Sequence, residues 1–206
     1  GFSGGGTTID FQIPANNKNQ INGIIGASWA TVTTDIPDDI LAINQASNDT
    51  SGMGIEHAVC NSTTWSFVVN NDKIKAQAGT SNTPFESYVR QGPGQFAVTL
   101  RAIPWLQWHV IDYPLDIWDG SAFTSTKLIA NDHVHFFPTP NSAWVQYLNG
   151  GEVVTEGPAG VRAFRNGYYA FGYPTWDPSG WSLNDVMNGV PAPYVPGAIF
   201  DADVTP

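Results

Sequence analysis

Short stretches in which apolar and polar residues alternate recur along the chain and predict β-strands. The first covers residues 7–13, with Ile9, Phe11 and Ile13 on one face, and Pro14 stops it. Further extended or apolar segments are predicted at residues 24–34, 55–60, 65–70, 73–78, 96–100, 106–110 and 127–137. Residues 79–94, which contain Gly and Pro, are expected to form a long exposed loop.

Two hairpins have the clearest local signals. The first joins residues 143–148 to residues 152–155 through Asn149-Gly150-Gly151. The second joins residues 161–165 to residues 168–173 through Asn166-Gly167. Asn-Gly readily adopts positive φ at both central turn positions, which matches the twist of the flanking strands.

Helical signals are few. One or two helical turns are predicted within residues 37–46, with Asp35 or Asp38 near the N-terminal cap. A second short helix is predicted over residues 182–188, because Ser182 with Asp185 resembles a shortened capping box and Gly189 offers a C-terminal stop.

The pattern as a whole predicts an all-β, mainly antiparallel fold: a single-domain β-barrel or sandwich with long loops and one or two short helices. About eight to eleven short strands, with turn signals every ~8–12 residues, are typical of that class. The 21 Gly and 15 Pro agree with a protein of strands and loops. Residues 1–6 are interpreted as a linker stub cut from a longer polypeptide, and residues 7–206 as one domain.

Charge excludes two classes of partner. The 206 residues include 8 Lys+Arg against 18 Asp+Glu, for a formal net charge of −10. Nucleic-acid affinity rests on basic residues that neutralise phosphates, and anionic membranes attract basic segments. No apolar run approaches the length of a membrane span. We therefore expect neither a nucleic-acid partner nor membrane insertion.

Residues that could carry chemistry do not form a recognisable catalytic or metal motif. His133 and His135 share one face of a strand, but no third ligand follows at a metal-site spacing. Cys60 is the only cysteine and is expected to be a small buried hydrophobe. The four Glu do not follow a glycosidase pattern, although a catalytic pair among the Asp residues stays open. We predict no enzyme activity, no metal and no cofactor.

Aromatic residues beside carboxylates give the best binding signal. Sugar recognition uses an aromatic face for the ring and Asp or Asn for its hydroxyls. Segments 118–120 and 176–181 are expected to be exposed loops of this kind. The competing interpretation places these aromatic residues in the core or in an oligomer contact. The candidate receptor-binding residues are Trp118, Asp119, Tyr173, Trp176, Asp177 and Trp181.

In size, composition and boundaries the chain resembles the projecting spike domain of an astrovirus capsid, including those of avian astroviruses. The resemblance implies a β-barrel core with decorated loops, a homodimer, a place on the virion surface and attachment to a host-cell receptor, with glycans among the candidates. Few charges and many aromatic residues also favour a homodimer, because exposed apolar patches usually mark interfaces. The alternatives are a secreted lectin or carbohydrate-binding module, and a small glycoside hydrolase.

Overall fold

The described residues of the computed structural model form two compact units. One unit comprises residues 1–140 together with 195–206, and the other comprises residues 141–194. The structure describes residues 12–19, 21, 23–77, 84–118, 121–141, 143–149, 162–165, 168–176, 179–187 and 189–205. Most of the first predicted strand, residues 7–13, therefore lies outside the described residues. The single-domain organisation of residues 7–206 stays a prediction.

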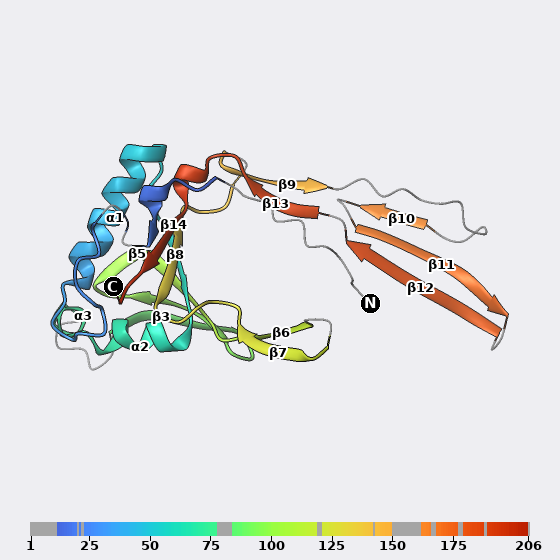
Figure 1. Ribbon diagram of the computed structural model, residues 1–206, viewed down its shortest axis with the longest axis horizontal. Helices are drawn as coiled ribbons and strands as arrows, with labels where there is room; N and C mark the ends of the chain where they lie inside the picture. The colour runs from blue at the N-terminus through green and yellow to red at the C-terminus, as the bar shows by residue number, and fades with distance from the viewer. Residues whose placement is uncertain are drawn as a thin grey trace. The chain divides into compact units, whose positions relative to one another are not determined.

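A seven-stranded mixed sheet is the centre of the first unit (Figure 1), with the strand order β1-β14-β8-β2-β5-β4-β3. Two neighbouring pairs, β1 with β14 and β2 with β5, are parallel, and the other pairs are antiparallel. The strands are β1 (Lys18–Asn19), β2 (His57–Cys60), β3 (Phe85–Gly92), β4 (Gln95–Leu100), β5 (Ile103–Ile111), β8 (His133–Phe137) and β14 (Phe200–Asp203).

The prediction of a mainly antiparallel all-β fold is correct only in part. The protein is mostly β, but its main sheet is mixed and three α-helices belong to the same unit. Parallel neighbours need a crossover connection, and the chain between β2 and β5 supplies one that includes two helices and two strands. No helix among the described residues is long and apolar enough to cross a membrane.

Helix α1 (Ile36–Ser51) begins where the sequence predicts and continues beyond it, over 16 residues. The side chain of Asp35 accepts a hydrogen bond from the backbone N–H of Asp38, and Pro37 occupies the first turn. Gly52 ends the helix in the left-handed conformation, at a φ of 73°.

Helices α2 (Ser62–Asn70) and α3 (Asp72–Gln77) replace the extended segments predicted there. Each begins after a fully buried asparagine whose side-chain oxygen accepts backbone N–H groups of the first turn. Asn61 accepts from Thr64 at 2.9 Å, and Asn71 accepts from Ile74 at 3.2 Å. Asparagine caps of this kind open a helix even where β-branched residues follow.

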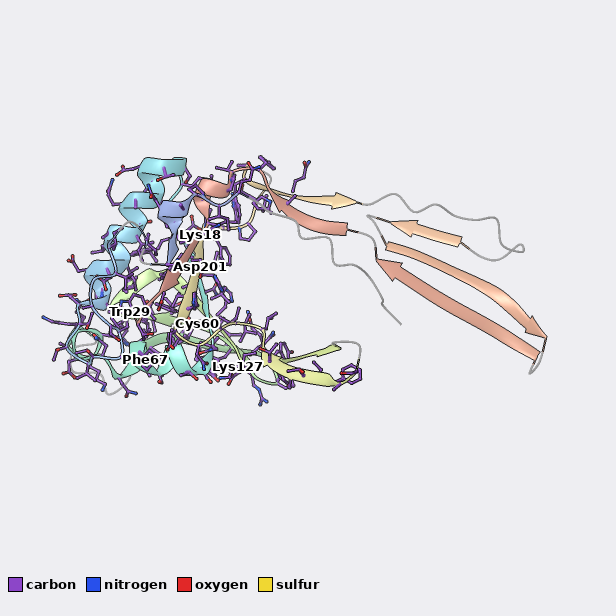
Figure 2. The ribbon with its side chains drawn as sticks, in the orientation of Figure 1. Lys18, Trp29, Cys60, Phe67, Lys127 and Asp201 are labelled. Carbon is purple, nitrogen blue, oxygen red and sulfur yellow. The ribbon has the colours of Figure 1, made fainter. Side chains whose placement is uncertain are left out.

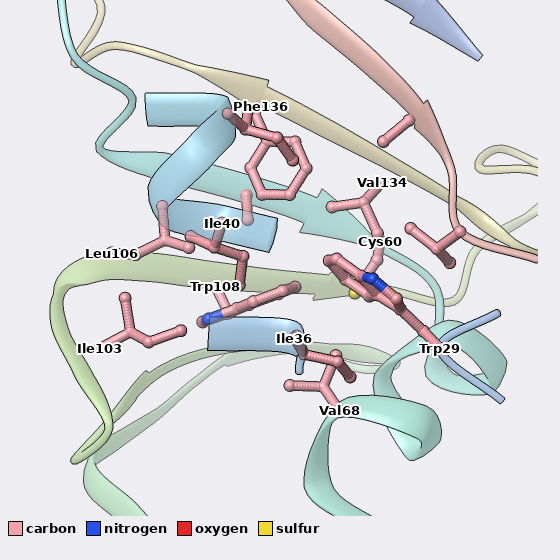
Figure 3. Close-up of a cluster of buried hydrophobic side chains, with 14 of the residues drawn as sticks. Trp29, Ile36, Ile40, Cys60, Val68, Ile103, Leu106, Trp108, Val134 and Phe136 are labelled. Carbon is pink, nitrogen blue, oxygen red and sulfur yellow. The ribbon is translucent and has the colours of Figure 1, made fainter. Parts of the chain in front are cut away.

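The helices cover one face of the sheet, and the hydrophobic core lies between them and the strands (Figure 3). Trp108 of β5 is fully buried, and its ring packs against Trp65 of α2, with centroids 5.4 Å apart, and Phe136 of β8, 6.3 Å apart. Ile36 and Ile40 of α1 belong to the same cluster. Helix α1 therefore buries an apolar face against the sheet.

The segment predicted as an extended stretch at residues 24–34 is instead a series of turns. Backbone N–H groups of Thr31 and Thr34 donate to carbonyls three residues earlier. Trp29 is fully buried, and its indole N–H donates to Asp39 at 2.8 Å. Burial raises the pKa of Asp39, and the hydrogen bond from Trp29 opposes that change. The apolar residues here fill the core without forming a strand.

Two further segments differ from the prediction in detail. The loop expected at residues 79–94 contains β3, which pairs antiparallel with β4. The strand expected at 127–137 is divided between the end of β7 (Phe123–Lys127) and β8. β7 pairs with β6 (Pro114–Trp118) as a separate hairpin, and Lys127 lies at its base (Figure 2), where it forms an ion pair of 3.4 Å with Asp112.

The second unit consists of two small antiparallel sheets. β10 (Arg162–Arg165) and β11 (Tyr168–Trp176) form the hairpin predicted around Asn166-Gly167. β12 (Ser179–Met187) pairs with β11 at nine positions, so the short helix predicted over residues 182–188 is wrong. β9 (Val145–Asn149) pairs with β13 (Gly189–Pro193). The return strand predicted for β9, residues 152–155, lies outside the described residues.

Candidate functional site: the histidine face of the sheet

The sheet face opposite the helices carries every histidine of the chain. Residues of the central strands alternate between the buried core and this second face, as in β8, where Val134 and Phe136 are buried. The four histidine side chains on the second face are half-buried, and we call this surface the histidine face. Its histidines are His57 of β2, His109 of β5, and His133 and His135 of β8.

Strand register brings these residues together from distant parts of the sequence. His135 lies opposite Asp201 of β14 on one side and Val59 of β2 on the other. Val59 in turn lies opposite His109 of β5, and His109 opposite Ala97 of β4. A single row across five strands therefore runs through a carboxylate, an imidazole, the side chain of a valine, a second imidazole and an alanine.

A chain of hydrogen bonds links four side chains at one end of this face. Thr139 donates its hydroxyl to Glu56, so its oxygen accepts from Nε2–H of His57 at 3.2 Å. Nδ1 of His57 is then an acceptor, and Nε2–H of His109 donates to it at 3.0 Å. Phe137 stacks on His57, with ring centroids 5.6 Å apart. His57 is neutral in this arrangement, because its Nδ1 accepts a hydrogen bond and therefore carries no proton.

The geometry allows the histidine pair to hold one added proton but not two. Partial burial lowers the pKa of His57, and Glu56 opposes this change only in part. Burial lowers the pKa of His109 as well, and a charge on His57 lowers it further. If both rings were imidazolium ions, Nδ1 of His57 and Nε2 of His109, which lie 3.0 Å apart, would each carry an N–H. Neither nitrogen could then accept a hydrogen bond from the other, and the two positive charges would repel.

Asp201 joins the two histidines of β8. Its Oδ1 lies 2.9 Å from Nδ1 of His133 and 3.2 Å from Nδ1 of His135. Hydrogen bonding from His135 is the main cause that lowers the pKa of Asp201 to about 2, against partial burial. The spacing of residues near His133 and His135 in the sequence shows no third polar group beside them. The fold places the carboxylate of Asp201 next to both histidines. Among the described residues, no group of three or more His, Cys, Asp or Glu is arranged to hold a metal ion.

The lowered pKa values predict that the fold loses stability in mild acid. Below pH 6.5 the unfolded chain binds protons at His57 and His109 before the folded chain does, so the free energy of unfolding decreases as the pH falls. Asp201 adds a second loss between pH 3.8 and about 2. Urea unfolding at a series of pH values measures both.

A glutamine substitution tests the assignment of the first loss. His109→Gln keeps an N–H donor for His57 but removes one titrating group, so we expect a shallower decrease in stability below pH 6.5. Thr126→Ala, at an exposed position on β7, is the control and should leave the pH dependence unchanged. Equal slopes for the wild type and His109→Gln would contradict the assignment.

Those residues predicted to bind a receptor that the structure describes belong to strands other than those of the histidine face. Trp118 is the last residue of β6, opposite Phe123, and its side chain lies outside the described part of the structure. Asp119 and Asp177 also lie outside it. The predicted loop at residues 176–181 is a strand hairpin: Trp176 ends β11 opposite Ser179, and Trp181 of β12 is opposite Pro174. Tyr173 is opposite Ser182 in the same hairpin. Binding through these residues stays a prediction.

Cys60 is a small buried hydrophobe, as the sequence predicts. It is fully buried, and burial raises the pKa of its thiol well above the usual range.

The pairing of His57 with His109 is missed by sequence reasoning. The sequence holds only a weak signal for it, namely that each histidine alternates with buried residues along its own strand.

Comparison with known proteins gives one family and two similar folds. The family model of phage major capsid protein E matches residues 2–204. A protein assigned as the capsid protein of a prophage of Escherichia coli CFT073 has a TM-score of 0.56 and 16% identity, over 96% of this chain and 55% of that chain. A phage-related protein of Bordetella bronchiseptica RB50 has a TM-score of 0.53 and 13% identity, over 87% of this chain and 54% of that chain.

The chain thus spans about half the length of these two solved chains. At this level of identity the two similarities show the fold alone. No curated protein sequence matches the chain significantly.

Proposed function

The chain belongs to the family of phage major capsid protein E, and from this premise we propose that it is a wall-forming subunit, many copies of which build the shell of a bacteriophage. Its function is that of a viral capsid protein. The observation that carries the proposal is the extent of the family match, which covers residues 2–204. The family indicates a structural role rather than an enzymatic one.

Family membership corrects the resemblance to an astrovirus spike, which is wrong: the capsid protein is of phage type. Host-receptor attachment followed from the spike resemblance and is left without support. The secreted lectin and the glycoside hydrolase have no support from the family match either.

The low charge of the chain and its exposed apolar side chains support a role in which large areas contact other subunits. Only 13% of the residues are charged, and interface cores are depleted in charged residues. Helices cover one face of the seven-stranded sheet. The other face carries half-buried side chains, among them His57, Val59 and His109. Several large apolar side chains of the first unit are also exposed, including Trp105 at 40% and Phe123 at 71%.

Self-assembly of the purified protein tests the proposal. We expect sedimentation velocity to detect large particles whose fraction rises with protein concentration, and electron microscopy to show closed shells of uniform diameter. Trp108→Ala, which removes the central core side chain, serves as a control for aggregation, because an unfolded protein should give irregular material instead. A folded wild-type protein that stays monomeric over the whole concentration range would contradict the proposal.

A further inference from the structure

The hydrogen-bond chain on the histidine face fastens the end of β8 to its neighbours. Pairing between β8 and β2 covers three positions and ends with His57 opposite Phe137. At this end the backbone N–H of Glu56 donates to the carbonyl of Phe137, at 3.1 Å. Thr139, two residues further on, contacts Glu56 and His57 through its hydroxyl. The side chain of Thr139 therefore extends the attachment of β8 beyond its last residue pair.

Two prolines limit the backbone contacts of the segment after β8. Pro138 and Pro140 flank Thr139, and a proline has no backbone N–H to donate to a neighbouring strand. Thr139 and Glu56 are exposed, so water can take over their hydrogen bonds once the contact opens. The first compact unit ends at Pro140 on this side. An opening of this segment therefore needs few backbone bonds to break.

The protonation state of the histidine pair decides whether the chain of hydrogen bonds is possible. One added proton leaves it intact: if His109 takes the proton on Nδ1, its Nε2–H still donates to His57, and His57 still donates to Thr139. A second proton puts an N–H on both facing nitrogens, so one ring must turn away. Phe137 stacks on His57, so a movement of His57 also disturbs the last residue of β8.

We propose that His57, His109, Thr139 and Glu56 form an acid-sensitive latch, which opens when both imidazoles are protonated and then releases residues 137–140 from β2. The latch is a property of the single chain, so the inference does not depend on the proposed function. The element with two states is the segment of residues 137–140, which is either fastened or open. The core between the sheet and its helices stays folded in both states.

The charges around the pair are carboxylates and other imidazoles. The segments that form β2, β5 and β8 contain no Lys or Arg. The other titratable residues that share the histidine face with the pair come from the residue before β2 and from β8 and β14: Glu56, His133, His135 and Asp201. Asp201 contacts the two histidines of β8, which leaves Glu56 as the carboxylate of the latch itself.

Acid favours the open state of the latch. Burial lowers the pKa of His57, against the effect of Glu56, and burial together with the charge on His57 lowers the pKa of His109. An imidazole that turns into water regains its ordinary pKa, so the open state binds more protons than the closed state below about pH 6.5. The fraction of open molecules therefore rises as the pH falls.

Amide hydrogen exchange at Glu56, followed by NMR, tests the latch, because the N–H of Glu56 donates to the carbonyl of Phe137. Its protection factor is the exchange rate of an unfolded peptide divided by the observed rate at the same pH. We expect this factor to fall by about tenfold or more between pH 7 and pH 5.

The N–H of Arg101, which donates to the carbonyl of Pro84 at 2.9 Å, is the control and should keep its protection. Unchanged protection at Glu56 would overturn the proposal. An equal fall at Glu56 and Arg101 would overturn it as well, because the first unit would then unfold as a whole. Protection at Arg101 also verifies the fold of each variant below.

Two substitutions of Thr139 test the attachment. Thr139→Val removes the hydroxyl and keeps the shape, so protection at Glu56 should already be low at pH 7, near the value of the wild type at pH 5. Thr139→Ser retains the hydroxyl and is the matched control, which should keep the pH dependence of the wild type. Wild-type protection at pH 7 in Thr139→Val would count decisively against the latch.

His109→Gln tests the trigger. The glutamine amide can donate to Nδ1 of neutral His57 or accept from it once His57 is protonated, so two charged rings never face each other. We expect the protection factor of Glu56 to be the same at pH 7 and pH 5 in this variant. His133→Gln, the same change at the other end of β8, should leave the fall in place. A fall in His109→Gln as large as in the wild type would overturn the proposal.

Discussion

Replacing Trp108 by alanine is expected to lower the free energy of unfolding by about 3–5 kcal/mol, the range for large aromatic residues in well-packed cores. Trp108 is fully buried in the middle of β5, opposite Ala58 of β2 and Val98 of β4. Its ring contacts Trp65 of α2, so the cavity would open between the sheet and the helix. Most small domains have a free energy of unfolding of only about 5–15 kcal/mol, so the variant would lose a large part of its stability.

Two variants control this experiment, which uses urea denaturation. Trp108→Phe keeps an aromatic ring and removes an indole N–H that is buried without an acceptor among the described residues, so it should cost clearly less than alanine. Trp105→Ala, on the same strand but 40% exposed, should change stability by less than about 1 kcal/mol. If Trp105→Ala lowered the free energy of unfolding as much as Trp108→Ala, the assignment of Trp108 to the core and of Trp105 to the surface would be contradicted.

Replacing Asn61 by alanine is expected to cost about 3 kcal/mol, because one buried side chain makes both a helix cap and a loop anchor. Its oxygen accepts from the N–H of Thr64 at the start of α2, at 2.9 Å. Its amide nitrogen donates to the carbonyls of Ile129 and Ala130, at 3.2 and 3.0 Å, and to the side chain of Asn131, at 2.8 Å. Alanine would remove all four of these hydrogen bonds.

Serine at the same position separates the two roles of Asn61. Asn61→Ser retains an oxygen that caps the helix but lacks the amide donors, so its loss should fall between those of the wild type and Asn61→Ala. Thermal unfolding followed by circular dichroism ranks the three proteins. Equal stability of Asn61→Ala and the wild type would mean that the loop at residues 129–131 is held by other contacts.

Elements with strong local signals are predictable from the sequence. Alternation identifies β4 and β5, Asn166-Gly167 identifies the β10–β11 hairpin, and the Asp35 cap identifies the start of α1. Each of these signals acts within a few residues of the chain. Turn geometry and capping do not depend on what packs against the element, whereas alternation reflects the burial of one strand face and is still visible within a few residues.

Elements decided by distant partners are not predictable in this way. The cap-like pair Ser182 and Asp185 favours a helix locally, but pairing with β11 at nine positions makes the segment a strand. At α2 the opposite occurs: β-branched residues suggest an extended segment, and the buried cap at Asn61 with core contacts of Trp65 makes it helical.

On the histidine face too, the placement of residues within one strand is predictable from the sequence, and the contacts between strands are not. The sequence places His133 and His135 on one face of a strand, and the structure agrees. Asp201 is 66 residues beyond His135, and His109 is 52 residues beyond His57. Their contacts depend on the order of strands in the sheet, which includes parallel neighbours. Strand order is a property of the whole fold and leaves no mark in local spacing.

A cryo-electron microscopy reconstruction of particles assembled from the protein tests the central claim most directly, because it distinguishes a wall subunit from a projection. We predict that the seven-stranded sheet, in the order β1-β14-β8-β2-β5-β4-β3, lies within the continuous wall and repeats over the whole surface. A reconstruction in which this sheet stands outside a wall built by another polypeptide would contradict the claim.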